Sequence, residues 1–183
     1  MNDIHLKSER LAFTPINFSD LEAIHALHSL PETDEFNVLG IPENIEHTRA
    51  IIEEWIDENK KENNRIFTFS INFQGQFIGL IALNLGKEKY KNAEVWYKIH
   101  PGFWNKGFAT EALKTIIQFS FNNLHLHRIG AGCAVENVSS VRVLEKVGMT
   151  LEGRKRQNLP LKTGWSDNFE YAILSSDLLN IFF

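Results

Sequence analysis

The sequence predicts an α/β fold (α+β in its strand order): a mixed, mostly antiparallel, twisted sheet of about seven strands with helices on both faces. Two observations predict it. In the first half, runs that alternate apolar and polar residues are joined by short turns such as Gln74-Gly75-Gln76, which indicates hairpins. In the second half, strand-like segments with alternating apolar residues are separated by segments of helical period. This order favours strand–helix–strand crossovers whose helices cover the sheet.

The first half of the chain supplies two helices and three strands. Leu11 and Phe13 alternate with less apolar neighbours, as in a strand. Ser19 and Asp20 can cap the first helix, and Pro31 ends it. The expected elements are a strand at residues 6–15, a helix at 21–28, a loop at 33–44, a helix at 45–56 and strands at 65–73 and 77–83.

The second half is expected to add four strands, two helices and a last short helix. Gly148 suits the end of a helix, because glycine adopts the left-handed conformation required there. Ser176 and Asp177 can cap a last short helix. The elements are a strand at 94–99, a helix ending near 123, a strand at 128–135, a helix at 139–147 and strands at 149–156 and 168–174, with a turn-rich segment at 159–167. With no repeat or linker, residues 1–183 are expected to form a single domain.

The segment between the strand at 94–99 and the next helix is the most informative part of the chain. Unpaired backbone N–H groups of a first helical turn converge at such a point, and the helix dipole favours negative charge. Gly107 lets a ligand approach the backbone, and Ala109 adds little bulk. We therefore expect a phosphate or pyrophosphate site at residues 105–110, here named the anion loop. Neither the P-loop nor the dinucleotide-binding motif is present, so an ordinary strand-to-helix turn is the alternative.

Composition excludes several classes of function. The net charge of −4 gives no basic footprint for nucleic acid, and no apolar run approaches the roughly 20 residues needed to span a bilayer. The first residues lack the pattern of a secretory signal. The single Cys133 fits a reducing cytoplasm, and we expect it to pack in a buried strand rather than act as a nucleophile. His25 and His28 lack ligand partners nearby, so no metal site is expected.

A second motif, at residues 137–149, follows the anion loop about thirty residues later. Together with the run at 103–112 it resembles the GNAT acetyltransferase superfamily, whose loop signature is Q/R-x-x-G-x-G/A and whose later helix carries N-x-x-S/A and then K-x-G-F. More closely, the chain resembles the RimJ/RimL-like subgroup of ribosomal-protein N-terminal acetyltransferases. Further matching pieces, which bring the resemblance to about half of the chain, are Ala93, Glu94, Tyr171 and residues 10–15, 126–129 and 164–167.

Three positions depart from the family pattern. Trp104 stands at the Q/R position, as is usual in the subgroup, and Met149 replaces the usual Phe. Asn105 stands where the subgroup often has Gly. Because Asn tolerates a positive φ better than most residues, the loop is expected to keep its shape.

The resemblance implies acetyl-CoA as co-substrate and no metal. It implies that the pyrophosphate lies on the backbone amides of the anion loop. It also implies that the pantetheine arm enters between splayed strands at 94–99 and 128–135, like an added strand, where Gly130 and Gly132 allow close approach. The implied cofactor-binding residues are Ile99, Asn105, Lys106, Gly107, Phe108, Ala109, Thr110 and Asn137.

Two residues are catalytic candidates under this resemblance. An amine must lose a proton before it can attack, and Glu94 is the candidate base, with burial expected to raise its pKa. The alternative is that Glu94 pairs with a cation or caps its strand. Many relatives use a Tyr as the acid for the thiolate, but that position holds Leu144, so Ser140 is the candidate donor. Helix capping is the alternative role of both Ser140 and Asn137.

The acceptor is expected to be a primary amine, either the N-terminal amine of a ribosomal or other protein, or a small molecule such as an amino acid, polyamine or antibiotic. The superfamily uses the region of Glu32, Asp34 and Glu35 to shape acceptor binding, which favours a positively charged amine. A non-catalytic acyl-CoA-binding module is the main alternative. A nucleotide-binding kinase or hydrolase is remote, because the chain lacks the P-loop motif and paired metal-binding carboxylates. No nucleic-acid or membrane partner is expected, a homodimer is left open, and the expected localisation is cytoplasmic.

Overall fold

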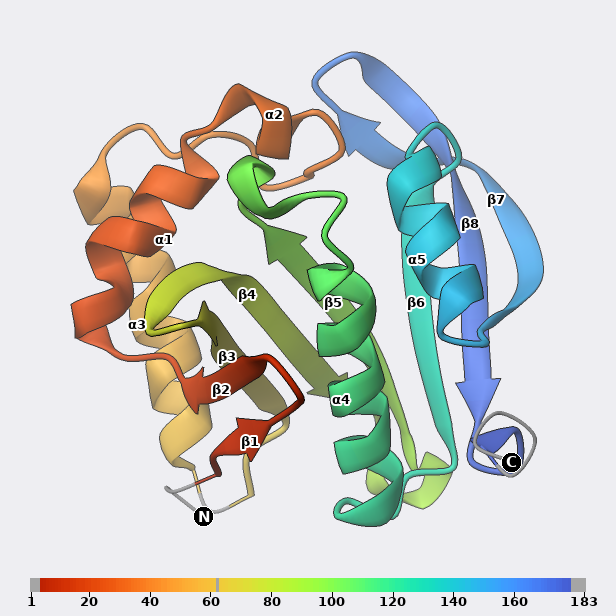
Figure 1. The fold of residues 1–183 in the computed structure, drawn as a ribbon. Helices are drawn as coiled ribbons and strands as arrows, with labels where there is room; N and C mark the ends of the chain where they lie inside the picture. The colour runs from red at the N-terminus through yellow and green to blue at the C-terminus, as the bar shows by residue number, and fades with distance from the viewer. Residues whose placement is uncertain (1–3, 62, 179–183) are drawn as a thin grey trace.

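A computed structural model describes residues 4–61 and 63–178. Its described part contains one eight-stranded sheet with the order β1-β2-β3-β4-β5-β6-β8-β7 (Figure 1). Every neighbouring pair is antiparallel except β5 and β6, so the predicted mixed, mostly antiparallel sheet is confirmed. The strands are β1 (Leu6–Lys7), β2 (Leu11–Pro15), β3 (Ile66–Phe73), β4 (Gln76–Leu85), β5 (Asn92–Ile99), β6 (Arg128–Ala134), β7 (Thr150–Leu161) and β8 (Gly164–Leu174).

Helices cover both faces of the sheet, as predicted. The helices are α1 (Leu21–His28), α2 (Pro31–Asp34), α3 (Ile45–Lys60), α4 (Phe108–Asn122) and α5 (Val138–Lys146). Because successive strand residues point to opposite faces, Leu80 of β4 packs with α1 and α3, whereas Ile81 packs with α4. None of the helices in the described part of the chain combines the length and apolar character needed to cross a bilayer.

The extra strand comes from the predicted first strand, which the structure divides into β1 and β2. The Ser8 N–H donates to the Leu11 carbonyl oxygen (2.9 Å), and this tight turn folds β1 back so that Leu6 lies opposite Phe13. The predicted loop at 33–44 also needs correction, because α2 reaches Asp34. Pro31 does not merely end α1, since it begins α2 at a first-turn position where proline is tolerated.

The late strands are longer than predicted. The turn-rich segment at 159–167 pairs within the hairpin of β7 and β8, with Leu159 opposite Ser166 and Pro160 opposite Trp165. Gly148 has a φ of 86°, which confirms its expected place after α5. The short helix expected after Ser176 and Asp177 lies largely outside the described residues.

Candidate functional site

The anion loop has the backbone geometry of an anion site. Asn105 has a φ of 60° and Gly107 a φ of 80°, so the positive φ expected to be tolerable at Asn105 is observed. Gly107 is the N-cap of α4, and the first intrahelical bond runs from the Glu111 N–H to the Gly107 carbonyl oxygen (3.0 Å). Among the described residues, none accepts a hydrogen bond from the backbone N–H groups of residues 105 to 110. Six donors therefore remain for a ligand beside a helix N-terminus.

Distant side chains hold the anion loop in place. Arg10 donates from Nη1 to the Lys106 carbonyl oxygen (3.1 Å) and from Nε to Glu111 Oε2 (2.6 Å), and its guanidinium lies 4.5 Å from the Phe108 ring centroid. Burial opposes ionisation of Glu111, but hydrogen bonds from Ser8 and Arg10 more than offset it and lower the pKa of Glu111. Glu111 thus stays an anion whose charge is balanced by Arg10.

An open depression of about 560 Å³ lies beside the anion loop. The β1–β2 segment and α4 supply most of its lining, with one side chain from the end of α5. The lining residues are Lys7, Ser8, Glu9, Gly107, Thr110, Glu111, Lys114, Thr115, Gln118 and Lys146. Three of them are lysines that sequence reasoning missed. For Lys114 the sequence did contain a signal. It follows Thr110 of the anion loop by four residues, and residues four apart lie on the same face of a helix.

The sheet splits next to this loop. The parallel pairing of β5 and β6 covers only Asn92–Glu94 against Arg128–Gly130. Beyond it, β5 pairs only with β4 up to Ile99, and β6 pairs only with β8. The strands lie together at their N-terminal ends and apart towards their C-terminal ends, with α4 in front of the separation (Figure 1). The splaying that the resemblance implied is therefore present, and it leaves two facing backbone edges for a ligand.

The α5 side of the split carries three polar side chains. The Tyr97 hydroxyl on β5 donates to Ser140 Oγ on α5 (3.4 Å). Burial is the main cause that raises the pKa of Tyr97 to about 12, so this hydroxyl keeps its proton at neutral pH. The Ser140 N–H donates to Asn137 Oδ1 (3.0 Å), which confirms Asn137 as the N-cap of α5. Sequence reasoning placed Ser140 and Asn137 together but missed Tyr97.

Two other residues on this side have packing roles. Leu144, at the position where the resemblance implied a tyrosine in many relatives, is 2% exposed in the core. Cys133 is buried in the same core, as expected. Burial, followed by the negative charge of Glu170, raises the pKa of the Cys133 thiol to about 11, so it is not an activated nucleophile.

Glu94 lies on the opposite face of the sheet, at the closed end of the split. It is opposite Gly130, and a side chain at Gly130 would come within 3.9 Å of Glu94 Cγ. The burial that we expected for Glu94 is wrong, because its side chain is exposed. Glu170 of β8 lies beyond Gly132 on the same face and pairs with Lys155 (3.0 Å).

Residues 10–150 match the family model described as "Acetyltransferase (GNAT) domain". The uncharacterized N-acetyltransferase YnaD of Bacillus subtilis is 31% identical over 177 residues, which cover 95% of this chain and 99% of YnaD. A GNAT acetyltransferase crystal structure from Bacillus anthracis has a TM-score of 0.81 at 30% identity, over 94% of this chain and 99% of that one. Spermidine N-acetyltransferase from Vibrio cholerae, solved with CoA and spermine, has a TM-score of 0.83 at 25% identity, over 94% and 100%. The chain therefore belongs to the GNAT family of acetyl-CoA-dependent N-acetyltransferases.

Proposed function

We propose that the protein transfers an acetyl group to a primary amine and that the anion loop and the split between β5 and β6 together hold acetyl-CoA. One observation carries this assignment. The strand that borders the split, β5, ends at Ile99, and the anion loop begins only a few residues later. One elongated ligand can therefore reach both features. An ordinary strand-to-helix turn would not require the neighbouring parallel strands to separate after three residue pairs.

The anion loop fits a pyrophosphate. Free N–H groups at Asn105, Lys106 and Gly107 precede those of the first helical turn, Phe108, Ala109 and Thr110. A Cβ at Gly107 would stand 3.4 Å from Arg10 Nη2 and would need a left-handed φ. Glycine at this position therefore keeps the loop open without strain.

The split fits the pantetheine arm. The edges of β5 and β6 that face each other carry backbone donors and acceptors, which an extended amide chain can pair with as an added strand does. Ile99 lies where this edge meets the anion loop, and its carbonyl oxygen accepts a hydrogen bond from Trp104 Nε1 (2.7 Å). Asn137 uses Oδ1 for capping, which leaves its Nδ2 as the donor available to the arm.

When bound, acetyl-CoA supplies a thioester carbonyl for attack by an amine. We assign Ser140 and Tyr97 to the departing thiolate, because the hydrogen-bonded pair lies between β5 and α5. Their hydroxyl groups can donate hydrogen bonds to the thiolate sulfur as it departs, and solvent supplies the proton that completes the thiol. We assign Glu94 as the base that accepts the proton of the amine, directly or through water. It lies on the other face of the sheet, at the closed end of the split.

Two acceptor classes are supported by different observations. The RimJ/RimL-like motifs support the N-terminal amine of a protein. The relative solved with spermine supports a polyamine. Glu94 lies on the acceptor face of this split, and its negative charge favours a cationic amine in both cases, whereas the charge of Glu170 on the same face is balanced by Lys155. We further propose that residues 1–183 act as one acetyltransferase domain in the cytoplasm.

The test is an acetyl-transfer assay with purified protein. Acetyl-CoA is offered with a panel of polyamines, amino acids and peptides with free N-termini, while release of the CoA thiol is followed and products are identified by mass spectrometry. We expect thiol release that depends on an amine and an acetylated product. Tight CoA binding without any acetylated product would favour a non-catalytic acyl-CoA-binding module.

A further inference from the structure

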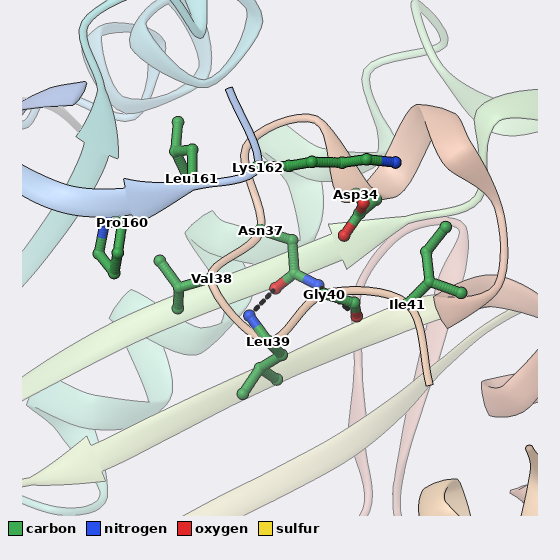
Figure 2. Close-up of a pocket in the computed structure, with 9 residues that line it drawn as sticks. All are labelled: Asp34, Asn37, Val38, Leu39, Gly40, Ile41, Pro160, Leu161 and Lys162. Carbon is green, nitrogen blue, oxygen red and sulfur yellow. Dashed lines mark hydrogen bonds between the residues drawn. The ribbon is translucent and has the colours of Figure 1, made fainter. Parts of the chain in front are cut away.

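A second cavity, of about 380 Å³, shares no lining residue with the anion loop depression. It lies between the loop after α2 and the tip of the β7–β8 hairpin (Figure 2). The lining residues are Asp34, Asn37, Val38, Leu39, Gly40, Ile41, Pro160, Leu161 and Lys162. Both segments are at the end of the sheet where β5 and β6 have separated (Figure 1).

Asp34 is the feature that suggests a ligand. Its side chain belongs to a residue that is only 5% exposed, and it extends from α2 towards the space between the loop and the hairpin (Figure 2). Among the described residues, none donates a hydrogen bond to Asp34 Oδ1. A buried carboxylate oxygen without a donor is unfavourable, because it has lost its hydration without a hydrogen bond in its place. A ligand in the cavity that donates to this carboxylate would offset the cost.

A lysine on β5 is an established source of positive charge for Asp34. Burial lowers the pKa of Lys98 to about 8, and the negative charge of Asp34 acts in the opposite direction. Lys98 therefore lies within electrostatic reach of Asp34, although no described residue accepts a hydrogen bond from its Nζ. Lys98 does not line the cavity. Lys162, at the rim, is exposed and its charge is screened by solvent.

The remaining walls are mainly apolar. Val38, Leu39 and Ile41 are 53%, 59% and 40% exposed, which is unusual for three large apolar side chains in one short loop. Pro160 and Leu161 face them across the cavity (Figure 2). A carboxylate surrounded by apolar surface is complementary to an ammonium group on an aliphatic chain, since the chain covers the walls while the nitrogen donates to the carboxylate.

We propose that this cavity binds a second cationic nitrogen of the acceptor, an ammonium carried on an aliphatic chain, and that Asp34 is its hydrogen-bonding partner. This inference rests on the acetyl transfer proposed above, because it assigns the cavity to the end of the acceptor that is not acetylated. A diamine or polyamine has such a nitrogen, and so does a peptide with a lysine near its N-terminus. The shared chemistry is the alkylammonium group.

The wild-type protein provides the first test. The value of kcat/KM is measured for cadaverine and pentylamine, which have the same carbon chain but differ in the second nitrogen. We expect cadaverine to be preferred by about 10- to 100-fold, as befits a hydrogen bond to a buried charge. Peptides with lysine or norleucine near the N-terminus form the second arm, and a preference confined to that arm identifies a protein as the source. Equal values in both arms would overturn the proposal.

Two variants locate the effect. Asp34→Asn keeps the size of the side chain and removes its charge, and Glu43→Gln makes the same charge change at an exposed residue outside the cavity. We expect the preference for the second nitrogen to disappear in Asp34→Asn, with activity on pentylamine retained, and to persist in Glu43→Gln. Loss of the preference in both variants would show a general charge effect and would contradict a specific role for Asp34. If Asp34→Asn does not fold, as judged by circular dichroism, the comparison of cadaverine with pentylamine in the wild-type protein still tests the proposal.

Binding without acetyl-CoA separates this inference from the proposed reaction. Calorimetry of cadaverine with wild-type protein and with Asp34→Asn needs no turnover. Binding that depends on Asp34, in a protein that acetylates no amine, would support the cavity and contradict the reaction. Turnover on monoamines and diamines alike, without binding that depends on Asp34, would support the reaction and contradict the cavity.

Discussion

Acidification should destabilise this protein through one histidine. His28, the last residue of α1, is 3% exposed and its ring packs edge-on against Trp55 at 6.1 Å. Burial, followed by the positive charges of Lys98 and then His25, lowers the pKa of His28 from 6.5 to about 4. Between these two values the unfolded chain binds a proton at His28 and the folded chain does not. The free energy of unfolding therefore falls as pH decreases through this window.

The size of the effect follows from the two pKa values. Since one pKa unit corresponds to about 1.4 kcal/mol, the complete loss is about 3 kcal/mol below pH 4, and about 2 kcal/mol is lost at pH 5. Above pH 6.5 the histidine is neutral in both states and contributes no pH dependence. Carboxyl groups titrate in the same acidic range, so the contribution of His28 to the free energy of unfolding has to be isolated by a variant.

The variant is His28→Leu, which replaces the ring by an apolar side chain. Urea unfolding of wild type and variant is measured at several pH values from about 8 to 5. The wild-type stability relative to the variant should fall by about 2 kcal/mol across this range. His127→Leu, at an exposed histidine, controls for the loss of one histidine from the unfolded chain. A wild-type-minus-variant difference that does not change with pH would refute the argument.

Three further substitutions test the donor site and the chemistry. Gly107→Glu should weaken CoA binding about tenfold or more, because it adds bulk and negative charge at the anion loop, and unchanged affinity in calorimetry would remove the loop from the site. Glu94→Gln should lower kcat by about 10²- to 10⁴-fold, and wild-type turnover across the neutral pH range would make Glu94 structural. Ser140→Ala should lower kcat more than it raises the KM for acetyl-CoA, with Tyr97→Phe as its companion. An effect confined to KM would leave Ser140 a binding residue.

Most of the fold could be predicted because its signals are local. The alternation in β3 and β4, the glycine after α5 and the helical period of α4 each lie within one short window. The full length of β7 and β8 could not, because residues 159–167 are rich in turn-forming types. There, pairing with the partner strand overrides weak strand propensity. A positive φ of 46° at Gln157, beside a break in the register, allows the strand to continue.

The candidate site divides in the same way. The anion loop is contiguous in sequence, so its glycine and its place before a helix could be recognised. The exposure of Glu94 depends on which helices cover that end of β5, and no window around Glu94 contains this information. Tyr97 meets Ser140 across more than forty positions, and the unpartnered Asp34 lies opposite a hairpin that is more than a hundred positions away. Such pairs are set by tertiary packing alone.

The split between β5 and β6 has a consequence for divergence of the sequence. Both edges that border it, like the anion loop, present main-chain atoms, and every residue except proline carries the same donor and acceptor. Contact with the donor therefore places little demand on the identity of side chains along these edges, as long as the strands keep their core residues and their course and no proline enters an edge. The proposed acceptor end has no such freedom, because a carboxylate such as Asp34 has no main-chain equivalent. Descendants of one ancestral chain can thus keep a common acetyl donor while each acquires its own amine.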